Sequence, residues 1–251
     1  MLKSIWWCFM YNNYIFDLYG TLIDINTDEG DKNLWEKFAF LYSYKNAYYT
    51  PEEIREDYCK YVEAEKKRVM KKYPHFTTVD IQIEKVFKKL FTAKKVKVTK
   101  KEVEFICTAF RCYSTVYIKL YEGVIDLLDT LKAKGKKIYL LSNAQRKFTE
   151  NELNMFELTK YFDGIVISSD ELCSKPDKEY YNTLFERYNL EKEKSIMIGN
   201  DYISDIKGAY DFGIDSLYIH QSISPEIKGK LYSNYSVMDG DVFKIKKLIV
   251  K

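Results

Sequence analysis

The chain has 251 residues, of which 46% are hydrophobic and 31% are charged, and its formal net charge is only +3. This composition excludes an intrinsically disordered chain and a strongly basic nucleic-acid-binding protein. A chain of this length can bury a large core, so we expect one core domain that carries one inserted domain.

The N-terminal segment lacks the pattern of a membrane anchor or a signal peptide. Its longest apolar run, residues 5–10, is far shorter than the roughly 20 residues of a membrane span, and no small-residue cleavage site is present. Met10 lies just ahead of the first predicted strand, so a later translational start there is a hypothesis. We expect a cytoplasmic protein with a small-molecule substrate and no membrane or nucleic-acid partner. The sequence carries no signal for an oligomeric state.

Cysteine and histidine are sparse, which leaves few candidates for thiol chemistry or a histidine-based metal cage. The two histidines, His75 and His220, are therefore interpreted as surface or packing residues. The cysteines are odd in number and form no C-x-x-C pair, so we expect reduced structural thiols. They are Cys8, Cys59, Cys107, Cys112 and Cys173.

The first predicted element is a short buried strand at residues 14–17, which Gly20 stops. From residue 31 onward, helical spacing replaces strand signals. A helical bundle inserted at residues 25–120 is therefore predicted, within a core of residues 1–24 and 121–251.

Two capping motifs mark helix starts inside this insert. Thr50, Pro51 and a following glutamate begin a helix that is expected to run to about Lys72. Thr99 and Glu102 begin another helix in the same manner. The lysine-rich stretches of the insert are interpreted as solvated helix faces.

After residue 123, predicted helices alternate with predicted strands. The helices are expected at residues 124–134, up to about 156, at 177–188 and at 204–212, and the strands at 137–142, 164–168, 195–199 and 216–220. This alternation predicts a doubly wound α/β fold, in which helices cover both faces of a parallel sheet. Ligands of such sheets bind beyond the carboxyl ends of the strands, so the polar residues that follow each strand form the candidate site.

Residues with complementary chemistry follow these strands. Phosphoryl transfer needs such a set of groups. The set consists of a candidate carboxylate nucleophile, hydroxyl groups for an anion, a balancing cation, and acids for a hard metal ion. In chain order they are Asp17, Thr21, Ser142, Asn143, Lys175, Asn200, Asp201 and Asp205. No Gly-rich nucleotide-binding loop follows the first strand.

The sequence resembles the haloacid dehalogenase (HAD) superfamily of hydrolases over nearly its whole length. Its four motifs are similar to FDLYGTL at 16–22, LSN at 141–143, Lys175-Pro176 and GNDYISD at 199–205. The resemblance implies that Asp17 is a covalent nucleophile, that Ser142 binds the transferring group, and that Lys175 steadies both. It also implies an HAD-like Rossmannoid core, a helical cap at the insert, and magnesium at the fourth motif in phosphatase members.

Departures from the family pattern leave the reaction open. Phosphatases of this family have a second aspartate two residues after the nucleophile, which protonates the leaving alcohol, and this chain has Tyr19 there. Tyr19 and Tyr181 resemble the dehalogenating branch, which attacks carbon and needs no metal, although Tyr181 equally suits a packing role. That branch also uses an arginine early in the cap, for which Arg55 is the nearest candidate. The carboxylate of Asp201, by contrast, suits a divalent ion and disfavours a carboxylate substrate.

We therefore predict a magnesium-dependent phosphatase of a small phosphorylated metabolite, acting through an aspartyl-phosphate on Asp17. The first alternative is a metal-independent 2-haloacid dehalogenase-like hydrolase with Asp17 as carbon nucleophile, and the second is a weakly active HAD-fold binding protein. Residues with a predicted catalytic role are Asp17, Tyr19, Thr21, Ser142, Asn143 and Lys175. The candidate Mg²⁺ ligands are Asp17, the Tyr19 carbonyl, Asp205 and either Asn200 or Asp201. Asp205 is also a candidate to orient Lys175 or a metal-bound water. The cap is expected to close over the site and contact substrate.

Overall fold

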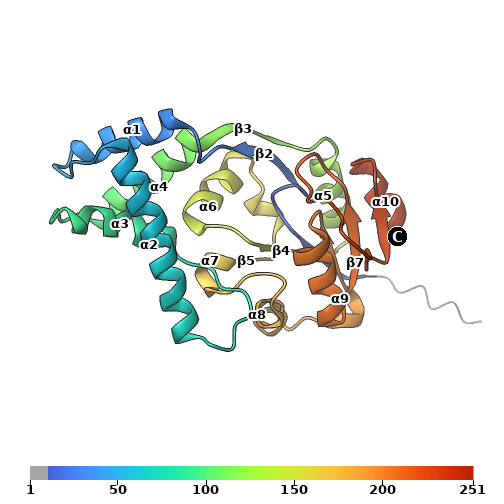
Figure 1. Cartoon of the computed structure of the whole chain (residues 1–251). Helices are drawn as coiled ribbons and strands as arrows, with labels where there is room; N and C mark the ends of the chain where they lie inside the picture. The colour runs from blue at the N-terminus through green and yellow to red at the C-terminus, as the bar shows by residue number, and fades with distance from the viewer. Residues whose placement is uncertain (1–10, 251) are drawn as a thin grey trace, which may run out of the picture.

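The computed structural model describes residues 11–250, so Cys8 and the hypothesis of a start at Met10 lie outside the described residues. Within this range, a six-stranded sheet runs in the order β5-β4-β1-β6-β7-β8. Figure 1 labels β5, β4 and β7 of this sheet. Every pairing in it is parallel. Its strands are β1 (Asn13–Phe16), β4 (Lys137–Ser142), β5 (Gly164–Ile167), β6 (Ser195–Gly199), β7 (Asp215–Ile219) and β8 (Tyr235–Val237). The predicted doubly wound α/β core is confirmed.

Side chains of the central strand alternate between two buried layers, as the pleat of a strand requires. Tyr14 and Phe16 pack with α5 (Val124–Ala133) and α10 (Phe243–Ile249) on one face. Ile15 packs on the other face with α8 (Lys178–Tyr188) and α9 (Gly208–Phe212). Each fully buried apolar side chain contributes about 1.5–3 kcal/mol, so the two layers hold the sheet and its strand ends in place.

Four helices form a separate bundle beside the sheet, with a core of its own. They are α1 (Lys32–Ser43), α2 (Pro51–Lys72), α3 (Ile83–Ala93) and α4 (Lys100–Ser114). The capping boxes predicted at Thr50 and Thr99 are both present, which confirms these two helix starts. Phe38, Phe87 and Phe110 meet at the centre of the bundle with ring centroids 5.1–5.4 Å apart.

Two strands join the bundle to the sheet, in a segment where no strand was predicted. β2 (Ile23–Thr27) and β3 (Thr115–Leu120) pair antiparallel as an isolated ribbon, which runs along the top of Figure 1. No residue of β3 is fully buried. The sequence of β3, TVYIKL, is rich in β-branched and aromatic residues, but it follows directly on α4, so the predicted helical insert ran through it.

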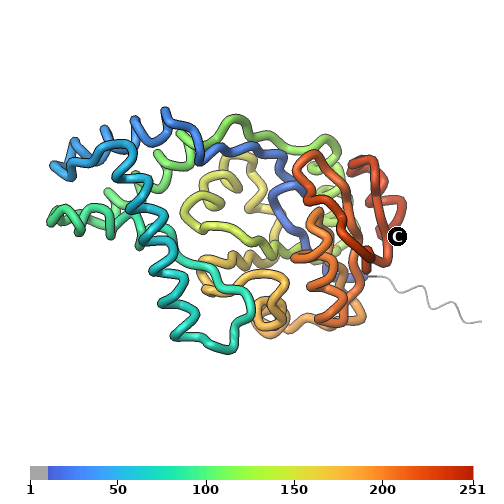
Figure 2. The backbone as a smooth tube through the Cα atoms, viewed as in Figure 1, coloured from blue at the N-terminus to red at the C-terminus, as the bar shows by residue number. Residues whose placement is uncertain are grey.

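The bundle also contacts the core at a second place, through the segment between α2 and α3. Figure 2 shows this segment running from the end of α2 to the loops beside α8. Asp177 accepts hydrogen bonds from the backbone N–H and hydroxyl of Thr77, and Val79 forms a β-bridge with Cys173. This loop of the core leads directly into Lys175.

The remaining elements differ from the prediction in detail. The helix expected to begin at Ser204 begins at Tyr202 as a π-helical segment, Tyr202–Lys207, which continues into α9. Strand β8 and helix α10 were not predicted. The helices α6 (Arg146–Met155) and α7 (Ser168–Glu171) and the 3-10 turns Thr159–Tyr161 and Lys192–Lys194 complete the described chain.

Two further expectations can be compared with the described residues. Cys59, Cys107, Cys112 and Cys173 are all free thiols, in line with the prediction of no disulfide among them. No helix within residues 11–250 combines the length and the apolar character needed to cross a bilayer.

Candidate active site

Asp17 lies where β1 ends at the carboxyl edge of the sheet. Its backbone N–H still donates to the carbonyl of Ile198 at 2.9 Å, so strand pairing fixes its position. The chain then turns sharply through Gly20, whose φ is +82°. A Cβ at Gly20 would lie 2.2 Å from Asn200 Nδ2, so both the backbone conformation and the close approach require glycine.

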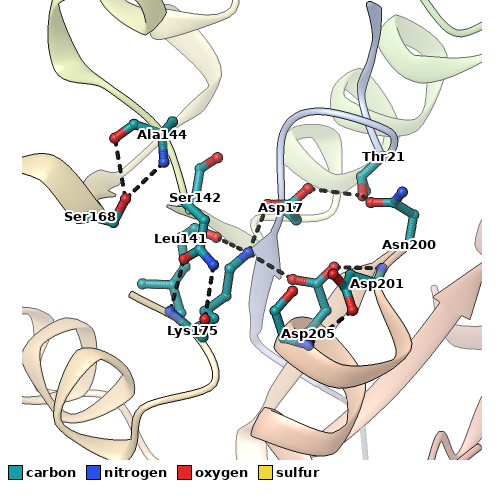
Figure 3. A network of polar contacts seen from close by, with 12 residues as sticks. Asp17, Thr21, Leu141, Ser142, Ala144, Ser168, Lys175, Asn200, Asp201 and Asp205 are labelled. Atoms are coloured by element: carbon teal, nitrogen blue, oxygen red, sulfur yellow. Dashed lines mark hydrogen bonds and ion pairs between the residues drawn. The ribbon is translucent and has the colours of Figure 1, made fainter. Parts of the chain in front are cut away.

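Lys175 is a fully buried cation beside Asp17. Its Nζ donates to Asp17 Oδ1 and to the Leu141 carbonyl, each at 2.7 Å, and forms an ion pair with Asp205 Oδ1 at 2.7 Å (Figure 3). Burial alone would lower the pKa of Lys175, but the carboxylates of Asp17 and Asp205 outweigh it and raise the pKa. The ammonium therefore stays charged, and it makes two hydrogen bonds and one ion pair with its neighbours.

Asn143 holds the backbone of this lysine. Its Nδ2 donates to the Lys175 carbonyl at 2.9 Å, and its Oδ1 accepts from the Lys175 backbone N–H at 2.8 Å. The side chain amide thus spans from the end of β4 to the loop that carries Lys175. This places Asn143 as a residue that positions the cation.

Asp205 is turned toward Lys175 in the structure. Its Oδ1 pairs with Lys175, and its Oδ2 accepts from the Asp201 backbone N–H at 2.9 Å. Gly199 provides the space, since a Cβ there would lie 2.3 Å from Asp205 Cγ. Burial raises the pKa of Asp205, and the contact with Lys175 opposes this rise. With Oδ1 in an ion pair with Lys175 and Oδ2 accepting a hydrogen bond, Asp205 is placed to orient Lys175, and its role as a metal ligand stays a prediction.

Three oxygen-bearing side chains converge near the free oxygen of Asp17. Thr21 Oγ1 lies 3.4 Å from both Asp17 Oδ2 and Asn200 Oδ1. Asp201 uses Oδ1 to cap the following helix, accepting from the Ile203 and Ser204 N–H groups, and keeps Oδ2 for another partner. Carboxylate and amide oxygens are the ligands of hard divalent cations, so this donor set fits such an ion.

The acidic side chains of this site do not by themselves form a metal-binding cluster. Within residues 11–250, no three His, Cys, Asp or Glu side chains are grouped for a metal ion. Asn200 contributes an amide and not a carboxylate to this site, and Asp205 pairs with Lys175.

Ser142, at the end of β4, carries a buried hydroxyl whose Oγ has no hydrogen-bond partner among the described residues. An unsatisfied buried hydroxyl costs about 1–3 kcal/mol, so such a group calls for an explanation. Ser142 is completely buried and is not among the described residues that line the cavity beside Asp17. Its anion-binding role therefore stays a prediction.

The side chain of Tyr19 makes its contacts away from Asp17. Its hydroxyl donates to Glu152 and lies 3.0 Å from Thr149 Oγ1, both on α6. Arg111 of α4 lies over the Tyr19 ring and pairs with Glu152 at 2.6 Å. Burial, and then the charge of Glu152, raise the pKa of Tyr19 far above its usual value. This hydroxyl is therefore a poor proton donor near neutral pH.

The contact of Tyr19 with Glu152 and Arg111 was missed by sequence reasoning. Glu152 lies 133 residues from Tyr19 and 41 residues from Arg111, and neither belongs to a motif. No local signal could have brought the three together.

A cavity of about 210 Å³ opens at this edge of the sheet. Its described lining residues are Asp17, Tyr19, Asn143, Lys175, Asn200, Asp201, Ser204, Asp205, Ile223 and Pro225. None of them belongs to α1–α4, so the helical bundle does not line the cavity in this structure, and the expected closure of the cap over the site stays a prediction. The loop after β7 supplies Ile223 and Pro225 instead, which the sequence reasoning had not singled out.

Two of the three residues considered for the dehalogenating branch, Arg55 and Tyr181, lie outside the cavity lining. Arg55 is exposed on α2 and is absent from the lining of the cavity. Tyr181 donates to the backbone carbonyls of Ser204 and Asp205 at 2.8 and 3.1 Å and stacks on Phe212. The structure therefore gives Tyr181 the packing role.

Comparisons with known proteins agree with this arrangement. The chain is 25% identical to the pyrophosphatase PpaX of Bacillus mycoides, covering 88% of this chain and 87% of that protein. It is 28% identical to the pyrimidine 5'-nucleotidase PynA of Streptococcus pneumoniae over 47% of this chain and 50% of that protein. The chain spans about half the length of several curated relatives that it matches, from 46% to 58%.

A solved structure shows the same fold. The HAD phosphatase from Thermococcus onnurineus superposes with a TM-score of 0.59 at 17% identity, covering 95% of this chain and 98% of that one. Structures described as dehalogenases superpose comparably, so the fold is common to both reactions. The family model of haloacid dehalogenase-like hydrolases matches residues 11–213. Together with the four strand-end motifs gathered around Asp17 and Lys175, this match places the chain among the haloacid dehalogenase-like hydrolases.

Proposed function

We propose that this protein is a magnesium-dependent phosphatase of a small phosphorylated metabolite. The observation that carries the proposal is the convergence of Asp17 with Lys175 on one side and with the oxygens of Asn200 and Asp201 on the other. A carboxylate nucleophile needs both a neighbouring cation and a site that offsets its repulsion from a phosphate. Relatives named pyrophosphatase and 5'-nucleotidase support a small phosphorylated molecule as the substrate.

In the proposed reaction, Asp17 attacks the phosphorus in line with the leaving group. The bond between Asp17 and phosphorus forms as the bond to the leaving oxygen breaks, and water then hydrolyses the aspartyl-phosphate to release inorganic phosphate. Two steps thus replace one harder step. Lys175 holds Asp17 through Oδ1, which leaves Oδ2 for the attack. Thr21, Ser142 and Lys175 bind the phosphoryl oxygens.

A divalent cation held by Asp17, the Tyr19 carbonyl, Asn200 and Asp201 would offset the repulsion between the carboxylate and the phosphate. Asp205 keeps Lys175 charged and in place. Because the Tyr19 hydroxyl is engaged with Glu152 and its pKa is raised, the leaving oxygen receives no proton from residue 19. The enzyme should therefore favour esters whose leaving group is stable as an anion.

The same observations disfavour the dehalogenase alternative. A 2-haloacid brings its own carboxylate, which the acid of Asp201 in the cavity would repel. Arg55, the candidate partner for that carboxylate, is absent from the cavity lining.

The test is a metal-dependence assay on two substrate panels, small phosphate esters and 2-haloacids. We expect release of inorganic phosphate that a chelator abolishes and that added Mg²⁺ restores. Halide release that is insensitive to the chelator, with no phosphate release, would overturn the proposal in favour of a dehalogenase. Absence of turnover on both panels with tight phosphate binding would identify a binding protein instead.

A further inference from the structure

The side chain of Asn200 is buried, and the oxygen and the nitrogen of its amide contact different partners. Only 5% of the residue is exposed. Its Oδ1 faces Thr21 and the Asp17 side of the cavity, and its Nδ2 donates to Ser224 Oγ at 3.3 Å. The amide lies against Gly20, where a Cβ would collide with it.

The two ends of an amide are nearly equal in shape and opposite in hydrogen bonding. The oxygen is an acceptor and can ligate a cation, whereas the NH₂ group is a donor and would repel one. An asparagine in a cation site therefore needs a neighbour that selects its orientation. A carboxylate at the same position would need none, because its two oxygens are equivalent.

Ser224 is held as a fixed acceptor for this NH₂ group. Its Oγ also accepts from the Gln221 backbone N–H at 2.9 Å, and its own N–H donates to the Gln221 carbonyl at 3.0 Å. The Gln221 side chain is anchored in turn, since Nε2 donates to the Gly240 carbonyl at 3.0 Å. This compact turn lies directly after β7 and presents Ile223 and Pro225 to the cavity.

We propose that Ser224 is a positioning residue that keeps Asn200 Oδ1 directed toward the cation. The inference rests on the proposed function, because it takes Asn200 as a ligand of the divalent ion. It adds that the loop after β7, which lies outside the four motifs, sets the affinity of the site for that ion.

The experiment measures Mg²⁺ binding to the full chain by isothermal titration calorimetry, without substrate. The variants are Ser224→Ala and Ser224→Thr, each made in the natural chain and in an Asn200→Asp background. We expect Ser224→Ala to weaken Mg²⁺ binding about 10-fold in the natural chain, the usual effect of removing a partner that orients a ligand. Ser224→Thr keeps the oxygen and should bind within about 2-fold of the natural chain, well short of that 10-fold effect.

The Asn200→Asp background separates orientation from a general disturbance of the loop. There, Ser224→Ala should change Mg²⁺ affinity less than about 2-fold, because a carboxylate offers oxygen at both ends. An equal loss in both backgrounds, or no loss in either, would overturn the inference. Failure of the natural chain itself to bind Mg²⁺ would overturn the metal role proposed for Asn200 and this inference with it, whereas binding that Ser224→Ala leaves unchanged overturns the inference alone. Thermal unfolding without metal checks that each variant is folded.

Discussion

Lys175 Nζ and Asp17 Oδ1 lie 2.7 Å apart, although 158 residues separate them along the chain. The contact joins the loop after β1 to the loop before α8. Val79, in the segment between α2 and α3, forms a β-bridge with this second loop. It leaves Asp17 Oδ2 facing the cavity, near Thr21. A buried pair of this kind both orients the carboxylate and keeps the lysine charged, so the chemistry and the stability of the site are coupled.

Replacing the nucleophile should remove activity and leave the fold. Asp17→Asn keeps the shape of the side chain and removes its charge, and Lys175 retains Asp205 as a counterion. We expect turnover to fall on the order of 10⁴-fold or more, as for other nucleophile replacements. Steady-state kinetics and a thermal melt check the two halves of this prediction. Ligand binding and cellular function that both survived the change would favour the binding protein.

Removing the buried cation should destabilise the protein, because the buried carboxylates beside it would lose their counterion. Lys175→Met leaves Asp17 and Asp205 without a counterion and should cost about 3–5 kcal/mol, as for one member of a buried ion pair. Adding Asp205→Asn removes one of the two charges and should recover part of that loss, while activity stays absent. Urea unfolding of both variants measures the difference. A double variant no more stable than Lys175→Met would contradict the role of Asp205.

The tyrosine at position 19 should limit the enzyme to good leaving groups. Aryl and acyl phosphates leave as stable anions, whereas alkyl phosphates need a proton. We expect Tyr19→Asp to raise kcat/KM for alkyl phosphates more than for aryl phosphates, on the order of the 10²-fold low end for general-acid catalysis.

Tyr19→Phe is the matched control, because it keeps the ring beneath Arg111 and removes only the hydroxyl bonded to Glu152. It should affect both ester classes equally and lower stability by about 1 kcal/mol, the net value of one hydrogen bond. An equal effect of Tyr19→Asp on both classes would mean that another group protonates the leaving oxygen.

Asp177 should stabilise the contact between bundle and core in a pH-dependent way. Burial alone would raise its pKa, but hydrogen bonds from the Glu179 and Thr77 N–H groups and the Thr77 hydroxyl outweigh it and lower the pKa below 3.8. A carboxyl group with a lowered pKa stabilises the folded state above its unfolded pKa, and this stability is lost as pH falls through the folded pKa. Asp177 is also the N-cap of α8.

Asp177→Asn replaces one carboxylate oxygen by an NH₂ group that cannot accept hydrogen bonds. It should therefore reduce the free energy of unfolding by about 1–2 kcal/mol at neutral pH. The difference from the natural chain should shrink as the pH falls below 3.8, where Asp177 itself becomes protonated. Urea unfolding at a series of pH values measures it, and Glu179→Gln is the charge-removal control, since Glu179 is exposed. A difference that stayed constant with pH would show that the Asp177 charge is not involved.

The sequence by itself determined the core and the members of the site. Strands such as β4 and β6 are continuous apolar runs because both of their faces are buried, and this pattern is local. The capping boxes at Thr50 and Thr99 are equally local, since each joins residues three positions apart. The acids, hydroxyls and lysine follow strand ends, and the parallel sheet brings those ends to one edge.

The tertiary structure decided what each member of the site faces. Asp205 turns to Lys175 because Gly199 leaves room for it, and Tyr19 turns to Glu152, which lies 133 residues away. The cavity takes Ile223 and Pro225 from the loop after β7 and no described residue from the helical bundle. These outcomes depend on how segments distant in sequence pack together. The whole fold sets the room for each side chain, its burial and the charges beside it, so no local pattern could encode them.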